Sequence, residues 1–180
     1  MSSKVTHDGK VPEIETERLR LRGHALEDFM FFADLWSKPD VTKFIGGKPR
    51  SEEETWSKFL RMIGHWQAMG FGYWAVEDKA RGALIGEVGV ADFKRVMSPS
   101  IKGELEAGWV LAPRAQGEGF ATEAMIAVLG WAEKHQPGKA ICAIIEPENI
   151  GSIKVAEKLG FTKTADTNYH GADIILYHLC

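Results

Sequence analysis

Residues 114–124, Arg-Ala-Gln-Gly-Glu-Gly-Phe-Ala-Thr-Glu-Ala, have the residue types and spacing of a loop that binds an anion. Gly117 and Gly119 stand between an apolar run and a segment of helical periodicity, where glycine lets the backbone approach a phosphate. Glu118 lies between them, and its own charge would oppose that anion. If backbone N–H groups hold the ligand, the Glu118 side chain can point away while its N–H still donates. The alternative is that the glycines only permit a tight turn between a strand and a helix.

Three kinds of phosphate loop could in principle occupy this segment. A Walker loop requires a lysine followed by serine or threonine after its last glycine, and that pair is missing here. A dinucleotide fingerprint requires a third glycine, where Thr122 stands instead. The residues fit the third pattern, Arg-x-x-Gly-x-Gly opening a helix, in which successive N–H groups point at a pyrophosphate.

The elements that must position this loop alternate between helix and strand. Strand patterns occupy residues 16–23, 73–78, 83–93, 103–113, 140–145, 162–167 and 172–179. Helical patterns occupy residues 25–37 and 51–69, the segment after Gly119, and residues 149–160. This order predicts an α/β (α+β) fold with a mostly antiparallel sheet and one βαβ-like crossover. Gly108 interrupts the strand at 103–113, which indicates a bulge or a close backbone approach.

Composition limits the possible classes of function. With 180 residues, 44% of them hydrophobic, the chain fits one domain, which we place at 14–180 after a loose arm at 1–13. The net charge of -3 argues against nucleic acid or an anionic membrane as a partner, and no apolar run is long enough to span a bilayer. Cys142 and Cys180 are far apart, which favours the reducing cytoplasm. The histidines have no metal-ligand spacing, so we expect no metal site.

Three motifs together resemble the GNAT N-acetyltransferases. They are the glycine loop, the Asn-x-x-Ser start of the helix at 149–152, and Glu-Lys-Leu-Gly-Phe at 157–161. The opening at 16–22, Thr-Glu-Arg-Leu-Arg-Leu-Arg, and the strand pattern at 74–89 resemble the RimJ/RimL-type branch, which acetylates amino groups including N-termini of ribosomal proteins. The resemblance covers about residues 14–180. It implies the GNAT fold, a sheet splayed at its central strands, acetyl-CoA as cofactor with CoA as product, and an amine acceptor.

The resemblance also implies which residues hold acetyl-CoA. Backbone groups of the splayed strand would bind the pantetheine arm, and here they belong to Gly108, Trp109, Val110 and Leu111. The pyrophosphate loop would consist of Arg114, Gln116, Gly117, Glu118, Gly119, Phe120, Ala121 and Thr122. Asn149 and Ser152 match polar contacts near the lower pantetheine and the thioester. Asn149 could instead serve purely as a helix cap, and the two roles are compatible.

Transfer of an acetyl group to an amine requires a base. A lysine amine has a pKa of ~10.4 and an α-amine one of ~7.7–8.0, so the attacking nitrogen must lose a proton, directly or through water. Glu106, just before Gly108, is the first candidate, followed by Glu104 and then Glu87 on the neighbouring strand. The alternative is that these carboxylates are merely solvated. An N–H group near Trp109 or Val110 could stabilise charge on the thioester oxygen.

The acid is where this sequence departs from the wider family. Many GNAT enzymes carry a tyrosine four residues before the Gly-Phe pair, where this chain has Ala156, while Tyr169 and Tyr177 lie on other elements. In the RimJ/RimL-type branch a serine matching Ser152 lies near the thioester, so Ser152 could orient the sulfur or relay a proton. The missing tyrosine supports a rival interpretation, a non-catalytic acyl-CoA-binding or sensing module. A nucleotide-binding enzyme ranks last.

The sequence indicates less about the acceptor than about the cofactor. The two early helices and the loop between them carry Trp36, Phe44, Trp56 and Trp66, which could be core residues or could line an acceptor pocket. A protein N-terminus and a small-molecule amine both remain open, as do a monomer and a homodimer. No cysteine occurs in the cofactor motifs, which favours direct transfer in a ternary complex over a covalent acetyl-cysteine.

Overall fold

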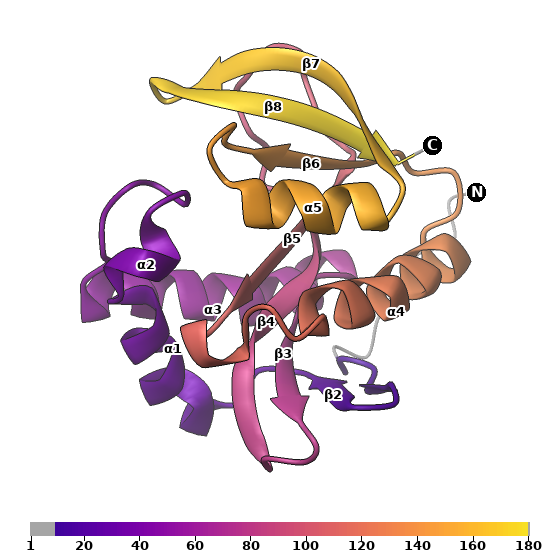
Figure 1. The fold of residues 1–180 in the computed structure, drawn as a ribbon. Helices are drawn as coiled ribbons and strands as arrows, with labels where there is room; N and C mark the ends of the chain where they lie inside the picture. The colour runs from indigo at the N-terminus through magenta and orange to yellow at the C-terminus, as the bar shows by residue number, and fades with distance from the viewer. Residues whose placement is uncertain (1–9, 180) are drawn as a thin grey trace.

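A computed structural model describes residues 10–179, and within that range eight strands form one sheet (Figure 1). The strands are β1 Ile14–Glu15, β2 Leu19–Arg22, β3 Tyr73–Asp78, β4 Ala83–Ala91, β5 Leu105–Leu111, β6 Ile141–Ile145, β7 Phe161–Tyr169 and β8 Ala172–Leu179. The α-helices are α1 Phe29–Trp36, α2 Pro39–Thr42, α3 Glu52–Met69, α4 Phe120–His135 and α5 Ile150–Lys158, with 3-10 turns η1 Leu26–Asp28 and η2 Pro113–Ala115.

The sheet runs in the order β1-β2-β3-β4-β5-β6-β8-β7. Among the described strands, β5 and β6 form the single parallel pair, because helix α4 carries the chain back across the sheet between them. All the other neighbouring strands of residues 10–179 pair antiparallel. The predicted α/β class, the mostly antiparallel sheet and the one crossover are therefore confirmed.

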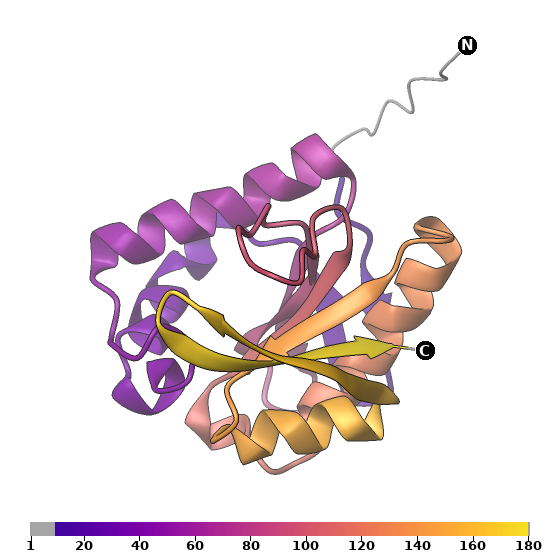
Figure 2. The same ribbon diagram turned by 90° about the horizontal axis from the view of Figure 1, so that it is seen from above.

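Helices cover both faces of this sheet. Figures 1 and 2 show α1, α2 and α3 on one side and α4 and α5 on the other. Helix α4 packs on β4 and β5 through the fully buried Met125 and Val128, and α5 packs on β6 and β7. On the opposite face, Phe32 of α1 and Phe59 of α3 share a buried cluster. The glycine loop and the start of α5 thus emerge at neighbouring positions beside the centre of the sheet.

Local signals explain where the early helices begin and end. Ser51 caps α3 in a reciprocal box, since its hydroxyl accepts from Glu54 N–H and the Glu54 carboxylate accepts from Ser51 N–H. Gly70, with φ of 71°, ends that helix. Pro39 begins the short α2 at a position where its missing N–H costs nothing.

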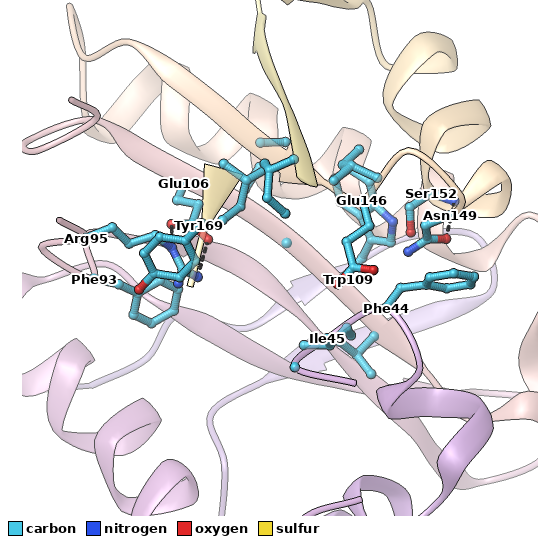
Figure 3. A pocket seen from close by; sticks show the side chains of 18 of the residues that line it. Phe44, Ile45, Phe93, Arg95, Glu106, Trp109, Glu146, Asn149, Ser152 and Tyr169 are labelled. Atoms are coloured by element: carbon cyan, nitrogen blue, oxygen red, sulfur yellow. Dashed lines mark hydrogen bonds and ion pairs between the residues drawn. The ribbon is translucent and has the colours of Figure 1, made fainter. Parts of the chain in front are cut away.

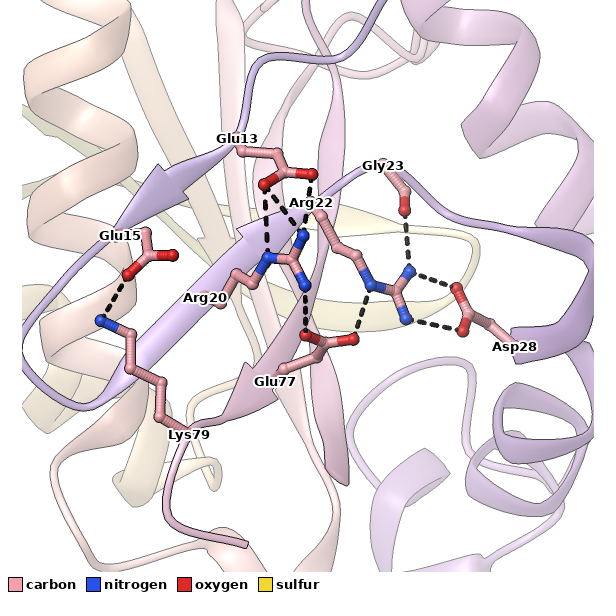
Figure 4. A network of polar contacts seen from close by, with 8 residues as sticks. All are labelled: Glu13, Glu15, Arg20, Arg22, Gly23, Asp28, Glu77 and Lys79. Carbon is pink, nitrogen blue, oxygen red and sulfur yellow. Dashed lines mark hydrogen bonds and ion pairs between the residues drawn. The ribbon is translucent and has the colours of Figure 1, made fainter. Parts of the chain in front are cut away.

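Two arginines on the polar face of β2 fasten the N-terminal edge of the sheet (Figure 4). Arg22 binds Asp28 at 2.7 Å and Glu77 at 2.6 Å, while Arg20 binds Glu13 at 3.0 Å. Both leucines of β2 are fully buried, as the alternating pattern predicts. The charged face therefore ties β1, β2, β3 and η1 together, with Asp28 as its buried member.

The predicted arm at 1–13 falls mainly on residues 1–9, which lie outside the described residues. Its last residues contact the sheet, because Trp74 Nε1 donates to the Pro12 carbonyl at 2.7 Å and Val11 packs against the main core. The division into an arm and one domain stays a prediction. Within residues 10–179 no helix has the length and apolar character needed to cross a bilayer.

Candidate active site

The sheet splits at its centre between β5 and β6. These strands pair only at Leu105 with Ile141 and at Glu106 with Cys142 in the described structure, and both then continue apart. A cavity of about 570 Å³ lies along the split. Its wall includes residues 106–110 of β5, residues 143–146 after and within β6, the start of α5, the loop at 44–46, and one face of α3. The predicted splay is therefore present, and it exposes β5 backbone groups to the cavity.

A row of three residues across the sheet shapes this cavity. Tyr73 of β3 is opposite Gly89 of β4, which is opposite Gly108 of β5. A Cβ atom at Gly89 would lie 2.8 Å from the Tyr73 ring, and one at Gly108 would lie 2.0 Å from the Tyr73 hydroxyl. The two glycines thus let the tyrosine reach across β4 to the cavity wall. Because the β4–β5 register runs unshifted through Gly108, the bulge alternative is wrong and the close approach is correct.

The glycine loop has a left-handed backbone conformation at both of its glycines. Gly117 and Gly119 have φ of 79° and 81°, a region that side chains other than glycine rarely adopt. Gly119 is the N-cap of α4, and no side chain of residues 10–179 caps this helix end. The first-turn N–H groups of Phe120, Ala121 and Thr122 therefore lack a capping side chain within the described residues.

Glu118 is held away from the helix end by ion pairing. Its carboxylate binds Arg81 of the β3–β4 turn at 2.9 Å, and its carbonyl accepts from Arg18 at 2.9 Å. Arg18 also pairs with Glu123 at 2.6 Å and lies 4.4 Å from the Phe120 ring centroid. The negative charge inside the loop is therefore neutralised by a partner from another turn, while the backbone remains available.

The remaining loop residues brace the turn. Arg114 donates to the Leu84 carbonyl at 2.8 Å, and Gln116 donates to the Leu111 carbonyl at 3.0 Å. Leu111 is buried and does not line the cavity, unlike Trp109 and Val110, which do. The loop itself lies beyond the cavity, so a ligand that uses both must extend from α4 along β5.

Asn149 and Ser152 reach the cavity from the start of α5. The Asn149 side-chain oxygen accepts from Ser152 N–H at 3.1 Å, so its capping role is present. Both residues also line the cavity. Figure 3 shows them at one side of it, together with Phe44, Trp109 and Glu146. Capping and an orientation toward a ligand are thus combined in the same asparagine.

Glu106 lies at the other side of the cavity, next to Phe93, Arg95 and Tyr169 (Figure 3). It is 6% exposed, and both of its oxygens accept from Arg95, at 2.5 Å from Nε and 2.7 Å from Nη2. Each oxygen keeps a further lone pair with which it can accept a proton from water or an amine. The arrangement places a carboxylate, oriented by Arg95, across the cavity from Ser152.

Glu87 is present in the cavity wall but is a poor base. It is 2% exposed, its Oε2 lies 3.0 Å from His24 Nε2, and its Oε1 accepts from Lys58. Burial raises the pKa of Glu87, but the charge of Lys58 and the bonds from His24 and Lys58 outweigh it and lower the pKa to about 2. A carboxylate with so low a pKa holds protons too weakly for general-base catalysis near neutral pH.

Glu104 lies outside the cavity, where its Oε2 pairs with His178 Nε2 at 3.0 Å. Tyr169 lines the cavity at the side of Arg95, whereas Tyr177 does not line it. Ala156 is fully buried in α5, so the departure from the tyrosine pattern leaves no hydroxyl there. Of the aromatic residues expected near the acceptor, Trp36 and Phe44 line the cavity, Trp66 joins the core, and Trp56 is 39% exposed.

Sequence reasoning missed several residues that complete the site. They include the partners Arg81 and Arg95, the hydroxyl of Tyr73, and the carboxylate of Glu146. Burial, and then the charge of Glu148, raise the pKa of Glu146. No local pattern indicated these roles, because each depends on a partner from another element.

Comparisons with known proteins agree with this geometry. Residues 18–162 match the acetyltransferase (GNAT) domain family. The chain is 40% identical over 150 residues to the uncharacterized N-acetyltransferase YnaD of Bacillus subtilis (strain 168), in a match that covers 83% of this chain and 82% of that protein. It is 30% identical over 158 residues to the uncharacterized protein YkkB of the same organism, covering 84% and 87%. An acetyltransferase structure from Agrobacterium tumefaciens str. C58 superposes with a TM-score of 0.82 at 27% identity, covering 95% of each chain.

Proposed function

Because the chain belongs to the GNAT acetyltransferase family and is an acyltransferase that uses acetyl-CoA, we propose that it transfers the acetyl group directly to a primary amine in a ternary complex. The acceptor is a protein N-terminus or a small-molecule amine. One observation carries the proposal, namely that Glu106 and Ser152 line a single cavity from opposite sides of the split between β5 and β6. An amine and a thioester can therefore meet between them.

The cofactor site that we propose extends from α4 to α5. The N–H groups at Gly117–Thr122 would hold the pyrophosphate, and the β5 backbone at Trp109 and Val110 would hold the pantetheine arm. The bound cofactor supplies the acetyl group as a thioester. Support comes from the positive φ of both loop glycines and from the uncapped end of α4 among the described residues. Arg114 and Gln116 would act by bracing the loop.

Glu106 is the base in this proposal. Its carboxylate takes a proton from the ammonium form of the acceptor, directly or through one water, so that the neutral nitrogen can attack. Arg95 holds the carboxylate in place through two hydrogen bonds. Among the three sequence candidates, Glu106 is favoured because Glu104 lies outside the cavity and Glu87 has a pKa of about 2.

Ser152 is proposed to act at the sulfur. Its hydroxyl would orient the thioester or pass a proton to the departing thiolate, whose pKa near ~8.5 makes such help useful but not essential. Replacement by Ser152→Ala should reduce kcat by roughly tenfold while the Kd of acetyl-CoA changes little. Unchanged turnover with an established acceptor would exclude the proton-donor role.

The rival interpretation, a non-catalytic acyl-CoA-binding module, is not favoured, since YnaD carries the name of an N-acetyltransferase. Membership in the RimJ/RimL-type branch remains part of the proposal and is supported by Thr-Glu-Arg-Leu-Arg-Leu-Arg at 16–22. A cytoplasmic location, and a monomer or homodimer, are proposed with it. The buried free thiol of Cys142 is compatible with a reducing compartment.

Initial rates of thiol release test the proposal. Acetyl-CoA and an acceptor amine are varied together, with candidate amines that include peptides with free N-termini and small primary amines. Direct transfer in a ternary complex gives intersecting reciprocal plots, whereas a covalent acetyl-enzyme gives parallel ones. If acetyl-CoA binds but no amine in the panel is acetylated, the result supports the non-catalytic acyl-CoA-binding module and refutes the proposed reaction.

A further inference from the structure

The acceptor side of the cavity carries an unbalanced set of cations. Around the ring of Trp36, the Arg50 guanidinium lies 4.9 Å and the Lys58 ammonium 4.5 Å from the centroid. Lys58 is paired with Glu87, whereas no carboxylate of residues 10–179 lies within ion-pair distance of Arg50. The nearby Glu54 is engaged in the cap of α3. Arg50 is thus a half-buried cation in the cavity wall whose charge no carboxylate of the described chain pairs with.

The same arrangement recurs around Phe93. Arg61 and Arg95 lie 5.3 Å and 5.2 Å from its ring centroid, and both line the cavity. Arg95 is paired with Glu106, but Arg61 has no ion pair within the described part of the chain. At each ring, therefore, one cation is paired with a carboxylate, and the other, which is half-buried at Arg50 and exposed at Arg61, has no ion pair within residues 10–179.

The charges of Arg50 and Arg61 affect the pKa of neighbouring cations, so the cations lie in the same region of the cavity wall. Burial, followed by the charge of Arg61, lowers the pKa of Arg50 and outweighs the opposite effects of the Glu54 and Glu87 charges. Burial also lowers the pKa of Lys58, and among the charges around it Arg50 and Arg61 act in the same direction. Besides Glu87 and Glu106, the cavity wall contains the carboxylate of Glu146, which lies at the opposite side with Asn149 and Ser152 (Figure 3). Since Lys58 pairs with Glu87 and Arg95 with Glu106, the cations of this wall left without an ion pair in the described chain are Arg50 and Arg61.

We propose that the acceptor amine carries an anionic oxygen group, a carboxylate or a phosphate, which Arg50 and Arg61 bind. The inference rests on the proposed acetyl transfer at this same cavity. Guanidinium groups match the geometry of both oxyanions and bind them through paired N–H donors. A half-buried cation without a counterion is unfavourable, and a bound anion would balance Arg50 while Arg61 adds a second set of donors. The charges of these two arginines disfavour a polycationic acceptor.

Binding of small anions tests this site without knowledge of the acceptor. Inorganic phosphate and malonate are titrated into the protein in the presence of saturating CoA, at ionic strength matched with sodium chloride, while the melting temperature is followed. We expect a rise in the wild type with at least one anion and its loss in Arg50→Gln/Arg61→Gln. Arg20→Gln, which removes only surface ion pairs with Glu13 and Glu77, should keep the rise. An absent rise, or an equal rise in the double variant, overturns the inference.

Turnover with matched amines separates this inference from the proposed function. Beta-alanine is compared with beta-alaninamide, and O-phosphoethanolamine with ethanolamine, so that the two pairs distinguish carboxylate from phosphate. Each single arginine variant should raise KM about tenfold for the amine that carries the carboxylate or phosphate, and change KM less than about twofold for its partner without that group. Equal acetylation of the amines without an anionic group, with no effect of either variant, would overturn the inference and leave acetyl transfer standing. Anion binding without transfer to any amine would count against the proposed reaction alone.

Discussion

The hydroxyl of Tyr73 occupies the space that a side chain at Gly108 would need, with 2.0 Å between that oxygen and the position of a Cβ atom. The ring reaches this position by crossing β4 above Gly89. Burial, and then the charges of Glu106 and Glu87, raise the pKa of Tyr73, so the hydroxyl stays protonated. A glycine on β5 and a tyrosine on β3 thus shape the cavity wall together.

The first prediction concerns this pair of residues. Gly108→Ala should lower the free energy of unfolding by about 1–3 kcal/mol, because the methyl group meets a buried ring in a packed sheet. Adding Tyr73→Phe should recover part of the loss, since the closest atom is removed and the next lies 3.1 Å away. Urea unfolding of the single and double variants measures the coupling.

Gly64 provides the matched control for that substitution. It lies inside α3, and no atom comes within 4 Å of the position that a Cβ atom would take there. Gly64→Ala should therefore stabilise the protein by about 0.5–1 kcal/mol. Equal effects at Gly64 and Gly108, or no recovery with Tyr73→Phe, would contradict the steric role of the tyrosine.

The second prediction concerns the base. Glu106→Gln keeps the shape of the side chain but cannot take a proton, so kcat should fall by roughly 10²–10⁴. Stopped-flow or steady-state thiol release with a saturating acceptor measures the effect. Glu104→Gln, outside the cavity, is the matched control and should retain nearly full kcat. Activity in Glu106→Gln that is close to the wild type would assign the proton transfer to another group.

The third prediction separates the two roles of Asn149. Asn149→Asp preserves an acceptor for the Ser152 N–H, so stability should remain within about 0.5 kcal/mol. The new negative charge lies in the cavity wall, where affinity for acetyl-CoA should fall. Asn149→Ala should lose about 1 kcal/mol of stability through the missing cap. Calorimetric titration measures the affinity of both variants for acetyl-CoA, and thermal unfolding measures their stability. Unaltered affinity in Asn149→Asp would leave Asn149 only the capping role.

The fourth prediction follows from the buried ion pair of Glu87 with Lys58. The pKa of Glu87 is about 2 in the folded state against a reference of 4.5, so its contribution is fully present above pH 4.5 and is lost as the pH falls toward 2. Between pH 6 and pH 3 the stability difference between the wild type and Glu87→Gln should shrink by about 2 kcal/mol. Urea unfolding at several pH values measures it.

A surface carboxylate is the comparison for that pH dependence. The difference between the wild type and Glu13→Gln should change little over the same interval, because the Glu13 side chain is 54% exposed. A difference for Glu87→Gln that stays constant down to pH 3 would show that the folded protein does not hold this carboxylate ionised.

Much of the fold could be predicted from the spacing of apolar residues and from the residues that begin or end helices and strands. Sequence patterns predict strands at 73–78 and 172–179 with the bounds that β3 and β8 have, and a helix at 51–69 that matches α3 to within one residue. Leu26 lies in the helical pattern predicted at 25–37, yet it is 63% exposed, because the chain there forms the 3-10 turn η1 and not an α-helix. Local spacing predicts a helix more reliably than it predicts which side meets the sheet.

The site was less predictable, because its decisive contacts join distant segments. Glu118 lies in a motif, but nothing local indicates Arg81 as its partner, and Glu106 does not indicate Arg95. The cluster of aromatic residues at the early helices is visible in the sequence, but tertiary packing alone decides that Trp36 lines the cavity and Trp66 the core. Residue type and periodicity are the same for both.

The cofactor site is tested most directly by a thermal-shift titration of the wild type with acetyl-CoA, CoA and ATP, repeated with Gly119→Val. At ~100 times its Kd a ligand adds about 2.7 kcal/mol, which for a domain of this size raises the melting temperature by roughly 5–10 °C. We predict this rise for acetyl-CoA and CoA, a smaller one for ATP, and a loss of the CoA effect in Gly119→Val, since valine does not tolerate a φ of 81°. No rise with acetyl-CoA or CoA at saturation, or the same rise in both proteins, would contradict the assignment of the glycine loop and split strands as the cofactor site.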